Sequence, residues 1–142
     1  MANPFLVLGG IAVGIITATF GVLAVPGWVA SAQDASAKND ISQISIGQAA
    51  SLSTTGYVKD TVANINGDGK VGVTVTTQAA AADVRVYPIT ATNAKQYIVI
   101  VKSASNTLWG RQDGGPIKKL VATSLPADYA AAVTALAAGT EG

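Results

Sequence analysis

The sequence predicts an α+β protein in which one long, apolar N-terminal helix packs on a small antiparallel sheet of three to four strands. Three observations lead to this prediction. The segment from Met1 to Gln33 contains no Asp, Glu, Lys, Arg or His. The apolar side chains that follow, up to about Thr55, recur loosely at helical spacing and lack the strict alternation of a strand. Beyond that point, short apolar runs are separated by residues that favour turns.

The composition argues against catalysis and against metal chemistry. The chain has 142 residues, no Cys, no His, a charged fraction of 12% and a net charge of +1. It therefore lacks thiol nucleophiles, the usual zinc ligands and the commonest general base. A charge near zero gives no attraction for nucleic acid. We expect no catalytic residues, no cofactor, no metal site and no specific nucleic-acid partner.

The uncharged run from Pro4 to Ala30 exceeds the length of about 18 apolar residues that can cross a bilayer as a helix. A secretory signal peptide is the alternative. However, the run has no Lys or Arg before it and is longer than the usual apolar region of about 7–15 residues. We therefore expect a retained segment, with residues 1–30 forming an apolar membrane or filament-core helix. Residues 31–142 are expected to form the globular domain.

The predicted helix would run from Pro4 to Thr55, which at 1.5 Å per residue is roughly 75–80 Å. We expect Pro26-Gly27 to interrupt or kink it, and Gly56 to end it. A helix of this length exceeds the width of a small domain. It therefore needs lipid or other protein copies to cover it.

The residues expected to contact other copies lie within the uncharged run and are apolar or small. They are Phe5, Leu8, Ile11, Gly14, Ile15, Ala18, Gly21, Leu23 and Pro26. Small residues four positions apart, such as Gly14 and Ala18, let helices approach closely, although glycine is also simply common in membrane helices. Exposing so much apolar surface would cost about 25 cal/mol per Å². A contact between copies that does not close on itself would produce a filament.

The rest of the chain is expected to supply the sheet. The turn-rich stretch Asn64–Lys70 precedes an alternating strand at Val71–Thr77. A second strand is expected at Asp83–Tyr87. The continuously apolar Tyr97–Lys102 is expected to be the central strand, covered on one face by the long helix.

Three further elements complete the prediction. Thr107–Arg111 is expected to pair with the central strand as a hairpin, and Ile117–Val121 to add a last short strand. The alanine-rich segment Pro126–Ala138 is predicted to be a short helix.

One stretch partly matches a calcium-binding loop. Asn64, Asn66 and Asp68 fall at the first, third and fifth loop positions, and Gly69 at the sixth. The twelfth position should be a bidentate acid but is Val75. A single carboxylate supplies too little charge for calcium, so a hairpin turn is the favoured interpretation.

A longer stretch resembles a known family. The segment DASAKNDISQISIGQAASLSTTGYVKD (Asp34–Asp60) resembles the helix of type IV pilins, especially the Gram-positive and actinobacterial type. Upstream, GVLAVP (Gly21–Pro26) is similar to the preceding part of that family's helix. Downstream, Gly72–Thr77 and Tyr97–Gly115 resemble its strands, although less specifically.

The resemblance implies a pilin-like fold and a structural role. Pilin helices bundle in the centre of a helical filament, and their sheet domains form its outside. Each subunit waits in the membrane before an assembly platform extracts it. The implied partners are therefore other copies of the chain, the membrane and pilus-type assembly machinery. The implied location is a filament at the cell surface, with a membrane-inserted precursor.

Other functions stay open. No Lys or Arg precedes the apolar run and no acid precedes Asp34, whereas pilins carry a basic leader and an early glutamate. A pseudopilin of a secretion system, or a viral fibre subunit with the same fold, is thus an alternative. Another is a single-span, membrane-anchored binding module outside the cytoplasm. A calcium-binding domain is the weakest.

Overall fold

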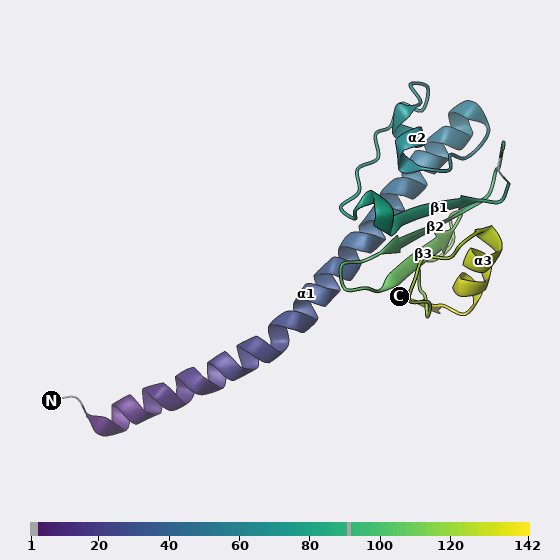
Figure 1. The fold of residues 1–142 in the computed structure, drawn as a ribbon. Coiled ribbons are helices and arrows are strands. Elements are labelled where there is room, and N and C mark those ends of the chain that lie inside the picture. The colour runs from purple at the N-terminus through teal and green to yellow at the C-terminus, as the bar shows by residue number, and fades with distance from the viewer. Residues whose placement is uncertain (1–2, 91) are drawn as a thin grey trace. The chain divides into compact units, whose positions relative to one another are not determined.

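The computed structural model describes the backbone of residues 3–90 and 92–142 and the side chains of residues 3, 26–90 and 92–142. Within these residues the protein is α+β, with a long N-terminal helix and an antiparallel sheet (Figure 1). The chain divides into two compact units, Met1–Ala32 and Gln33–Gly142.

Helix α1 spans Pro4–Thr55 and continues through Pro26. Of the interruption or kink expected at Pro26-Gly27, the interruption is therefore wrong. A proline removes one helical hydrogen bond, and the neighbouring bonds suffice to keep the helix formed. The predicted end of the helix is confirmed. Gly56 follows with a φ of 80°, a left-handed conformation that glycine adopts without steric cost. Its N–H donates to the Leu52 carbonyl over 3.1 Å.

The sheet has five strands in the order β1-β2-β3-β4-β5, with every neighbouring pair antiparallel. This corrects the expectation of three to four strands. The strands are β1 (Val84–Pro88), β2 (Tyr97–Lys102), β3 (Leu108–Gln112), β4 (Lys118–Lys119) and β5 (Thr140–Glu141). The last strand was not expected, because two polar residues before the C-terminal glycine carry no strand pattern.

The strand predicted at Val71–Thr77 is wrong, because this segment belongs to no strand. Its alternation has another cause. Val71 and Val75 are buried at 4% and 3% exposure, whereas Val73 is exposed. The Asn66 side chain takes the place of a neighbouring strand, since its amide exchanges two 2.7 Å hydrogen bonds with the Val75 backbone.

The hairpin predicted at Asn64–Lys70 is also wrong, because helix α2 occupies Val62–Gly67. The turn signal is confirmed only for Asp68–Val71, where the Val71 N–H donates to the Asp68 carbonyl at 3.0 Å. Thr61 caps this helix, and its hydroxyl accepts a hydrogen bond from the Asn64 N–H. A Thr at this position satisfies one of the free N–H groups of the first turn. A short 3₁₀ helix, η1 (Ala81–Asp83), leads from this region into β1.

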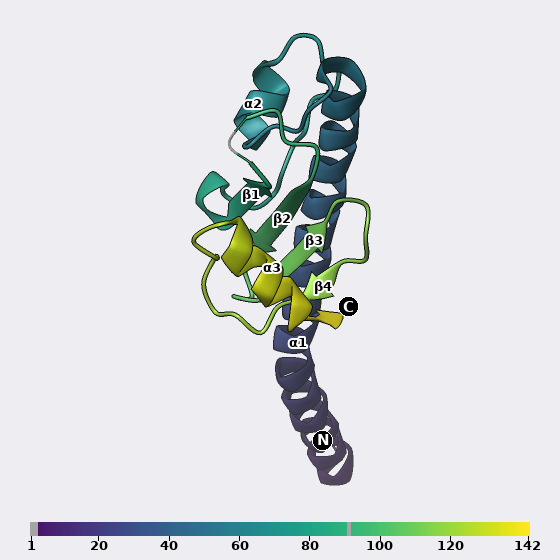
Figure 2. The same cartoon turned by 90° about the vertical axis from the view of Figure 1, so that its right-hand side faces the viewer.

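Both faces of the sheet are covered. The α1 part of Gln33–Gly142 covers one face, where Ile41 and Ile44 pack with Val99 and Val101. Helix α3 (Tyr129–Ala137) covers the other, where Leu136 packs with Ile98 and other apolar side chains (Figure 2). The first five residues of β2 are therefore all buried, which confirms the prediction that a helix covers this strand.

Polar side chains of α1 anchor the irregular segment that follows the helix. The buried carboxylate of Asp40 accepts the N–H groups of Gln78 and Ala79 at 2.9 and 2.8 Å. The Gln48 amide donates to the Lys59 carbonyl and accepts the Lys59 N–H, at 2.6 and 2.8 Å. Each of these buried groups therefore has a partner, as burial of a polar group requires.

Candidate assembly surface

The side chains predicted to mediate assembly lie mostly outside the described residues. This applies to Phe5, Leu8, Ile11, Gly14, Ile15, Ala18, Gly21 and Leu23, all of which fall on the described backbone of α1. Pro26 is described, and it is exposed.

Apart from Thr54 in the last turn, the exposed residues of α1 within Gln33–Gly142 lie on one narrow stripe, which we call the outer stripe. Its members are Ala35, Asn39, Ser42, Ile46, Ala49 and Ser53. All except the half-buried Ser42 are exposed, and Ile46 is 53% exposed. The steps along the sequence alternate between four and three residues. This is the spacing at which one helix packs along another.

The outer stripe carries no charge. Between residues 26 and 55, every exposed residue of α1 is uncharged. The exposed charged residues of the described chain lie elsewhere: Asp60, Lys70, Arg85, Lys95, Lys119, Asp128 and Glu141. A helix that faces water normally places charged side chains on its outer face. The outer stripe is therefore unlike the surface of a helix that stays in water.

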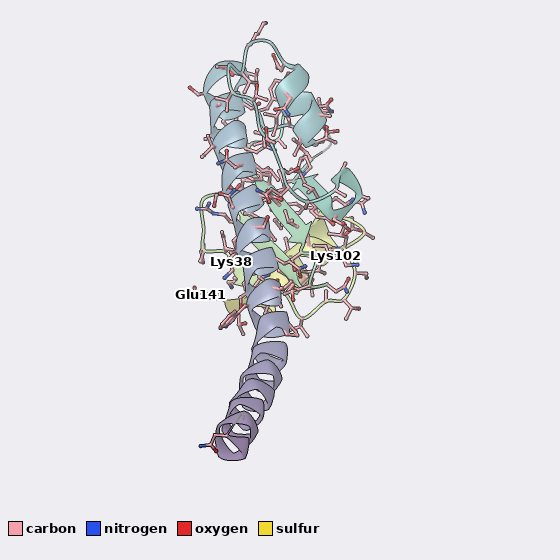
Figure 3. The ribbon with its side chains drawn as sticks, turned by 90° about the vertical axis from the view of Figure 1, so that its left-hand side faces the viewer. Lys38, Lys102 and Glu141 are labelled. Carbon is pink, nitrogen blue, oxygen red and sulfur yellow. The ribbon has the colours of Figure 1, made fainter. Side chains whose placement is uncertain are left out.

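The two partly buried charges near the start of this unit are held by the domain. Lys38 lies on α1 (Figure 3). Its ammonium lies 4.0 Å from the centre of the Trp109 ring, within the range of a cation–π interaction. Asp34 accepts hydrogen bonds from Ser103 and Ser105 at 2.7 and 2.6 Å. Both charges thus have partners on the sheet side of α1.

Burial by itself raises the pKa of the Asp34 carboxyl. The hydrogen bonds from Ser105 and Ser103 lower this pKa, and the positive charge of Lys119 lowers it further. The pKa of Asp34 is lowered as a result. Asp34 therefore remains an anion at neutral pH. Its hydrogen bonds with Ser103 and Ser105 hold the β2–β3 turn against α1.

A groove of 460 Å³ runs beside the outer stripe. We call it the α1 groove. Its α1 wall consists of Ser42, Ser45, Ile46, Ala49 and Leu52, and its sheet wall of Lys95, Tyr97, Arg111, Asp113 and Gly114. The α1 wall is formed by uncharged and mostly small side chains, whereas the sheet wall includes the charged side chains of Lys95, Arg111 and Asp113.

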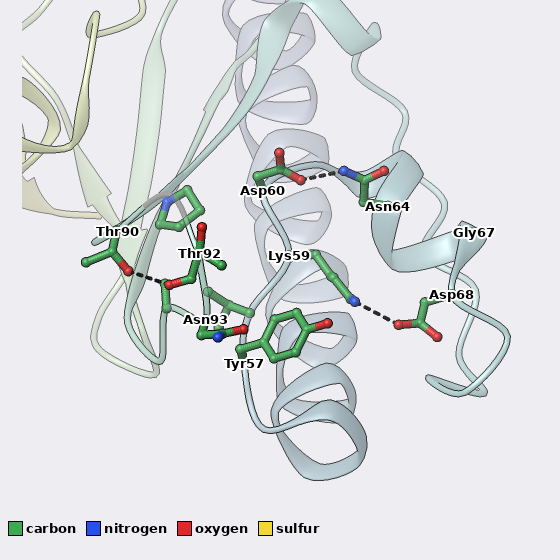
Figure 4. A pocket seen from close by; sticks show the side chains of 12 residues that line it. Tyr57, Lys59, Asp60, Asn64, Gly67, Asp68, Thr90, Thr92 and Asn93 are labelled. Atoms are coloured by element: carbon green, nitrogen blue, oxygen red, sulfur yellow. Dashed lines mark hydrogen bonds and ion pairs between the residues drawn. The ribbon is translucent and has the colours of Figure 1, made fainter.

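A second cavity, also of 460 Å³, is polar and lies near the C-terminal end of α1 (Figure 4). Lys59 and Asp68 form an ion pair across it at 2.7 Å. The hydrogen bond from Lys59 lowers the pKa of the Asp68 carboxyl, and the same bond raises the pKa of the Lys59 ammonium. The Asn64 amide is bonded to Asp60. The charged groups of this cavity are thus largely engaged with one another.

The side chains of the possible calcium loop do not point to a common site. Asn66 bonds the Val75 backbone, Asn64 bonds Asp60, and Asp68 pairs with Lys59. Across residues 3–90 and 92–142, no cluster of three acidic, His or Cys side chains is placed to hold a metal ion.

In the part of the chain that the structure describes, no helix has the length and apolar character needed to span a membrane. The run predicted to cross a bilayer falls largely on residues 4–25, whose side chains lie outside that part.

No protein-family model, curated protein or solved structure matches this chain. The likeness to pilins therefore depends on the sequence segments alone.

The assembly residues predicted from the sequence lie between Phe5 and Pro26, within an assembly element expected to run from Phe5 to about Ile46. That element includes most of the outer stripe, but the sequence analysis did not identify which face of the helix is exposed, and it missed the α1 groove. One signal was available. The sequence from Ile41 to Val58 contains no charged residue. The groove itself had no signal, because its sheet wall comes from residues more than forty positions away.

Proposed function

We propose that this protein is a pilin-like structural subunit that polymerises through its N-terminal helix into a helical surface filament. The observation that carries the proposal is the uncharged outer stripe of α1. It extends, within the globular unit, the absence of charge that marks the sequence from Met1 to Gln33. A helix face of this kind is suited to contact with other copies rather than with water.

The residues of the outer stripe support helix-to-helix contact. Ala35, Ala49 and Ser53 have small side chains, which allow two helix backbones to approach closely. Burying Ile46, which is 53% exposed, would add hydrophobic stabilisation at about 25 cal/mol per Å².

In this proposal the protein is not an enzyme, and its principal partner is another copy of itself. A membrane holds the subunit before assembly, and pilus-type machinery extracts it. The finished filament lies at the cell surface. A secretion pseudopilus or a viral fibre would use the same contacts.

A second candidate is a membrane-anchored binding module outside the cytoplasm. The polar cavity around Lys59 and Asp68 is the observation that favours it (Figure 4). In that case copies would stay in the membrane singly, and the cavity would take a polar ligand.

A matched pair of lysine substitutions tests the proposal. Ala35 on the outer stripe and Ala63 on α2 are both exposed helical alanines. Ala35→Lys places a charge where copies are proposed to meet, and filament yield should fall at least about tenfold, the equivalent of 1.4 kcal/mol. Ala63→Lys should assemble normally. Yield is measured by electron microscopy and sedimentation, and folding by circular dichroism melting.

The proposal fails if Ala35→Lys assembles as well as Ala63→Lys while both variants remain folded. Substitution within the uncharged run provides a second test. Gly14→Leu or Gly21→Leu should block assembly and leave the globular unit folded, because a large side chain keeps packed helices apart. Normal filament yield from both variants would contradict burial of that segment.

A further inference from the structure

One edge of the sheet is open. Strand β1 is the first strand in the sheet and pairs on one side only, with β2 (Figure 1). Residues of an antiparallel strand alternate between those whose backbone bonds the partner strand and those whose backbone points away from it. Just beyond β1, the Ile89 N–H donates to the Gln96 carbonyl at 3.0 Å. Counted back in steps of two, Arg85 and Tyr87 bond β2, and Val86 points its N–H and C=O outward.

Val86 carries the free backbone groups of this edge. The N–H of Val84 already donates to the Ala81 carbonyl, and Pro88 has no N–H. Within the described residues, no hydrogen bond reaches the outward N–H and C=O of Val86, although this residue is only 8% exposed. Buried backbone groups are normally bonded. The edge therefore has room for one short strand, paired at Val86.

A cavity of 720 Å³ lies against this edge, and we call it the edge cavity. It touches three consecutive residues of β1, from Val84 to Val86, and no residue of another strand. Neighbouring side chains of a strand point to opposite faces, so a cavity that meets three in a row lies at the edge of the strand. The apolar residues that line it are Val62, Ala63, Val75, Ala81, Val84 and Val86.

The lining of the edge cavity includes one acid and one base, Asp60 and Arg85. Asp60 is already engaged, since its carboxylate accepts a side-chain amide. Arg85 is exposed, and neither Asp83 nor Asp128 lies within ion-pair distance of it. One of its N–H groups donates to the Pro126 carbonyl at 3.3 Å. A guanidinium has five N–H donors, so most of them stay available for a carboxylate.

We propose that the edge cavity binds an extended peptide segment, which adds one antiparallel strand beside β1. The peptide residue opposite Val86 exchanges two backbone hydrogen bonds with it. Its side chain lies on the same face as that of Val86 and enters the apolar cavity, which suits Val, Ile or Leu. The following peptide residue stands opposite Arg85 on the other face, where Asp or Glu forms a cross-strand ion pair.

The partner is a different protein rather than a second copy. The peptide needs an aliphatic residue followed directly by an acidic one. In the 142 residues of this chain, no Val, Ile or Leu is directly followed by Asp or Glu. The contact is therefore additional to the proposed function and does not rest on it.

A synthetic peptide tests the strand pairing on the full-length chain in mild detergent. The probe is Thr-Thr-Val-Glu-Thr, with a fluorophore at its N-terminus and an amide at its C-terminus, and fluorescence polarisation gives its Kd. A methyl group on the Val nitrogen removes the bond to the Val86 carbonyl and should weaken binding at least about tenfold. The same methyl group on the Glu nitrogen, which points away from β1, should change the Kd less than about twofold.

A matched pair of variants tests the cavity. Ala81 and Ala82 are both exposed alanines of η1, but only Ala81 lines the edge cavity. Ala81→Phe fills the cavity and should weaken binding of the probe at least about tenfold, whereas Ala82→Phe should bind it normally. Circular dichroism melting checks that both variants are folded. Equal binding by the two folded variants would place the peptide elsewhere and overturn the proposal.

A charge reversal tests the acidic position of the peptide. The wild type should bind the Glu probe at least about fivefold more tightly than a probe with Lys at that position. Arg85→Glu should reverse this order, and Lys95→Glu, at an exposed lysine outside the cavity, should keep it. An unchanged order in Arg85→Glu would overturn the assigned peptide register.

The remaining outcomes are also decisive. No binding of the probe at concentrations up to about 1 mM would overturn the proposal. Equal losses from the two methylated probes would also overturn it, because a paired strand must show alternation. None of these measurements depends on filament formation, so their failure would leave the proposed function standing, and a chain that forms no filaments would leave the peptide contact standing.

Discussion

The two helical layers of the globular unit hold the sheet by different means. On the α1 side, the core includes buried polar side chains, Asp40, Gln48 and Ser51, as well as apolar ones. On the α3 side, the core cluster is apolar apart from the Tyr87 hydroxyl, which donates to the Pro126 carbonyl at 2.7 Å. The α1 layer thus depends on directional bonds, and the α3 layer on packing.

The two layers differ because α1 also covers an irregular segment of the chain, whereas α3 covers only regular strands. Between Gly56 and Val84 the chain forms only α2 and η1, so much of its backbone has no helix or strand partner. Buried N–H and C=O groups must still be hydrogen-bonded. Side chains of α1 supply these bonds. The α3 side covers regular strands whose backbone is already paired, so apolar contact is sufficient.

The largest expected effect on folding is at Asp40. Asp40→Ala removes the acceptor for the Gln78 and Ala79 N–H groups. Both hydrogen bonds to this fully buried carboxylate would be lost. Because hydrogen bonds to a charged group are worth about 1.5–3 kcal/mol each, the free energy of unfolding should fall by about 4 kcal/mol. Chemical denaturation measures the change. Asn39→Ala, at an exposed neighbouring position, should change it by less than about 0.5 kcal/mol. A loss at Asp40 no larger than at Asn39 would contradict the anchoring role.

The next largest effect is expected at Leu136, which is 5% exposed on the α3 side. Leu136→Ala should cost about 3 kcal/mol, since it leaves a cavity but no unsatisfied polar group. Leu136→Met, which keeps most of the volume, should cost less than about 1.5 kcal/mol. If the Met variant lost as much stability as the Ala variant, the α3 layer would not be held by packing volume.

The smallest effect is expected at Asp34. Its lowered pKa means that the folded state binds the proton more weakly than the unfolded state, for which 3.8 is the ordinary value. The stability that Asp34 contributes is therefore present above that pH and is lost as pH falls through the folded-state pKa. Asp34 is partly exposed, so solvent screening should limit the contribution to less than about 1 kcal/mol.

The test compares the wild type with Asp34→Asn from pH 6 to pH 2 by thermal melting. The wild type should be more stable near neutral pH, and the difference should vanish at the acid end. A difference that stays constant over this range would contradict the assigned role of the Asp34 carboxylate.

The regular part of the fold was predictable from the sequence. The pattern around β1, the apolar run of β2 and the hairpin with β3 all appear as predicted, as does α3. Long or strongly patterned segments carry their own signal because burial selects their residues. Gly56 was predictable for a similar reason, since few residues adopt its left-handed conformation.

The irregular part was not predictable. Val71–Thr77 alternates like a strand, but Asn66 and Asp40 satisfy part of that region's backbone from a distance. Local pattern cannot reveal which distant side chain takes this role. The α1 groove was missed for the same reason. The outer stripe was missed although the helix to Thr55 was predicted. Asp34, Lys38 and Asp40 stand among its first residues in the sequence, and only the structure shows that these three charged side chains are partly or fully buried.

The most direct test of the central claim is the solvent accessibility of the outer stripe before and after assembly. Asn39→Cys lies on the stripe, and Ala63→Cys lies on α2. Both positions are exposed in the single chain, so both should react with a maleimide before assembly. In filaments, labelling at position 39 should slow at least about tenfold, while position 63 should remain reactive. Equal labelling of the two positions in filaments, or a chain found only as single copies in membranes, would contradict the claim.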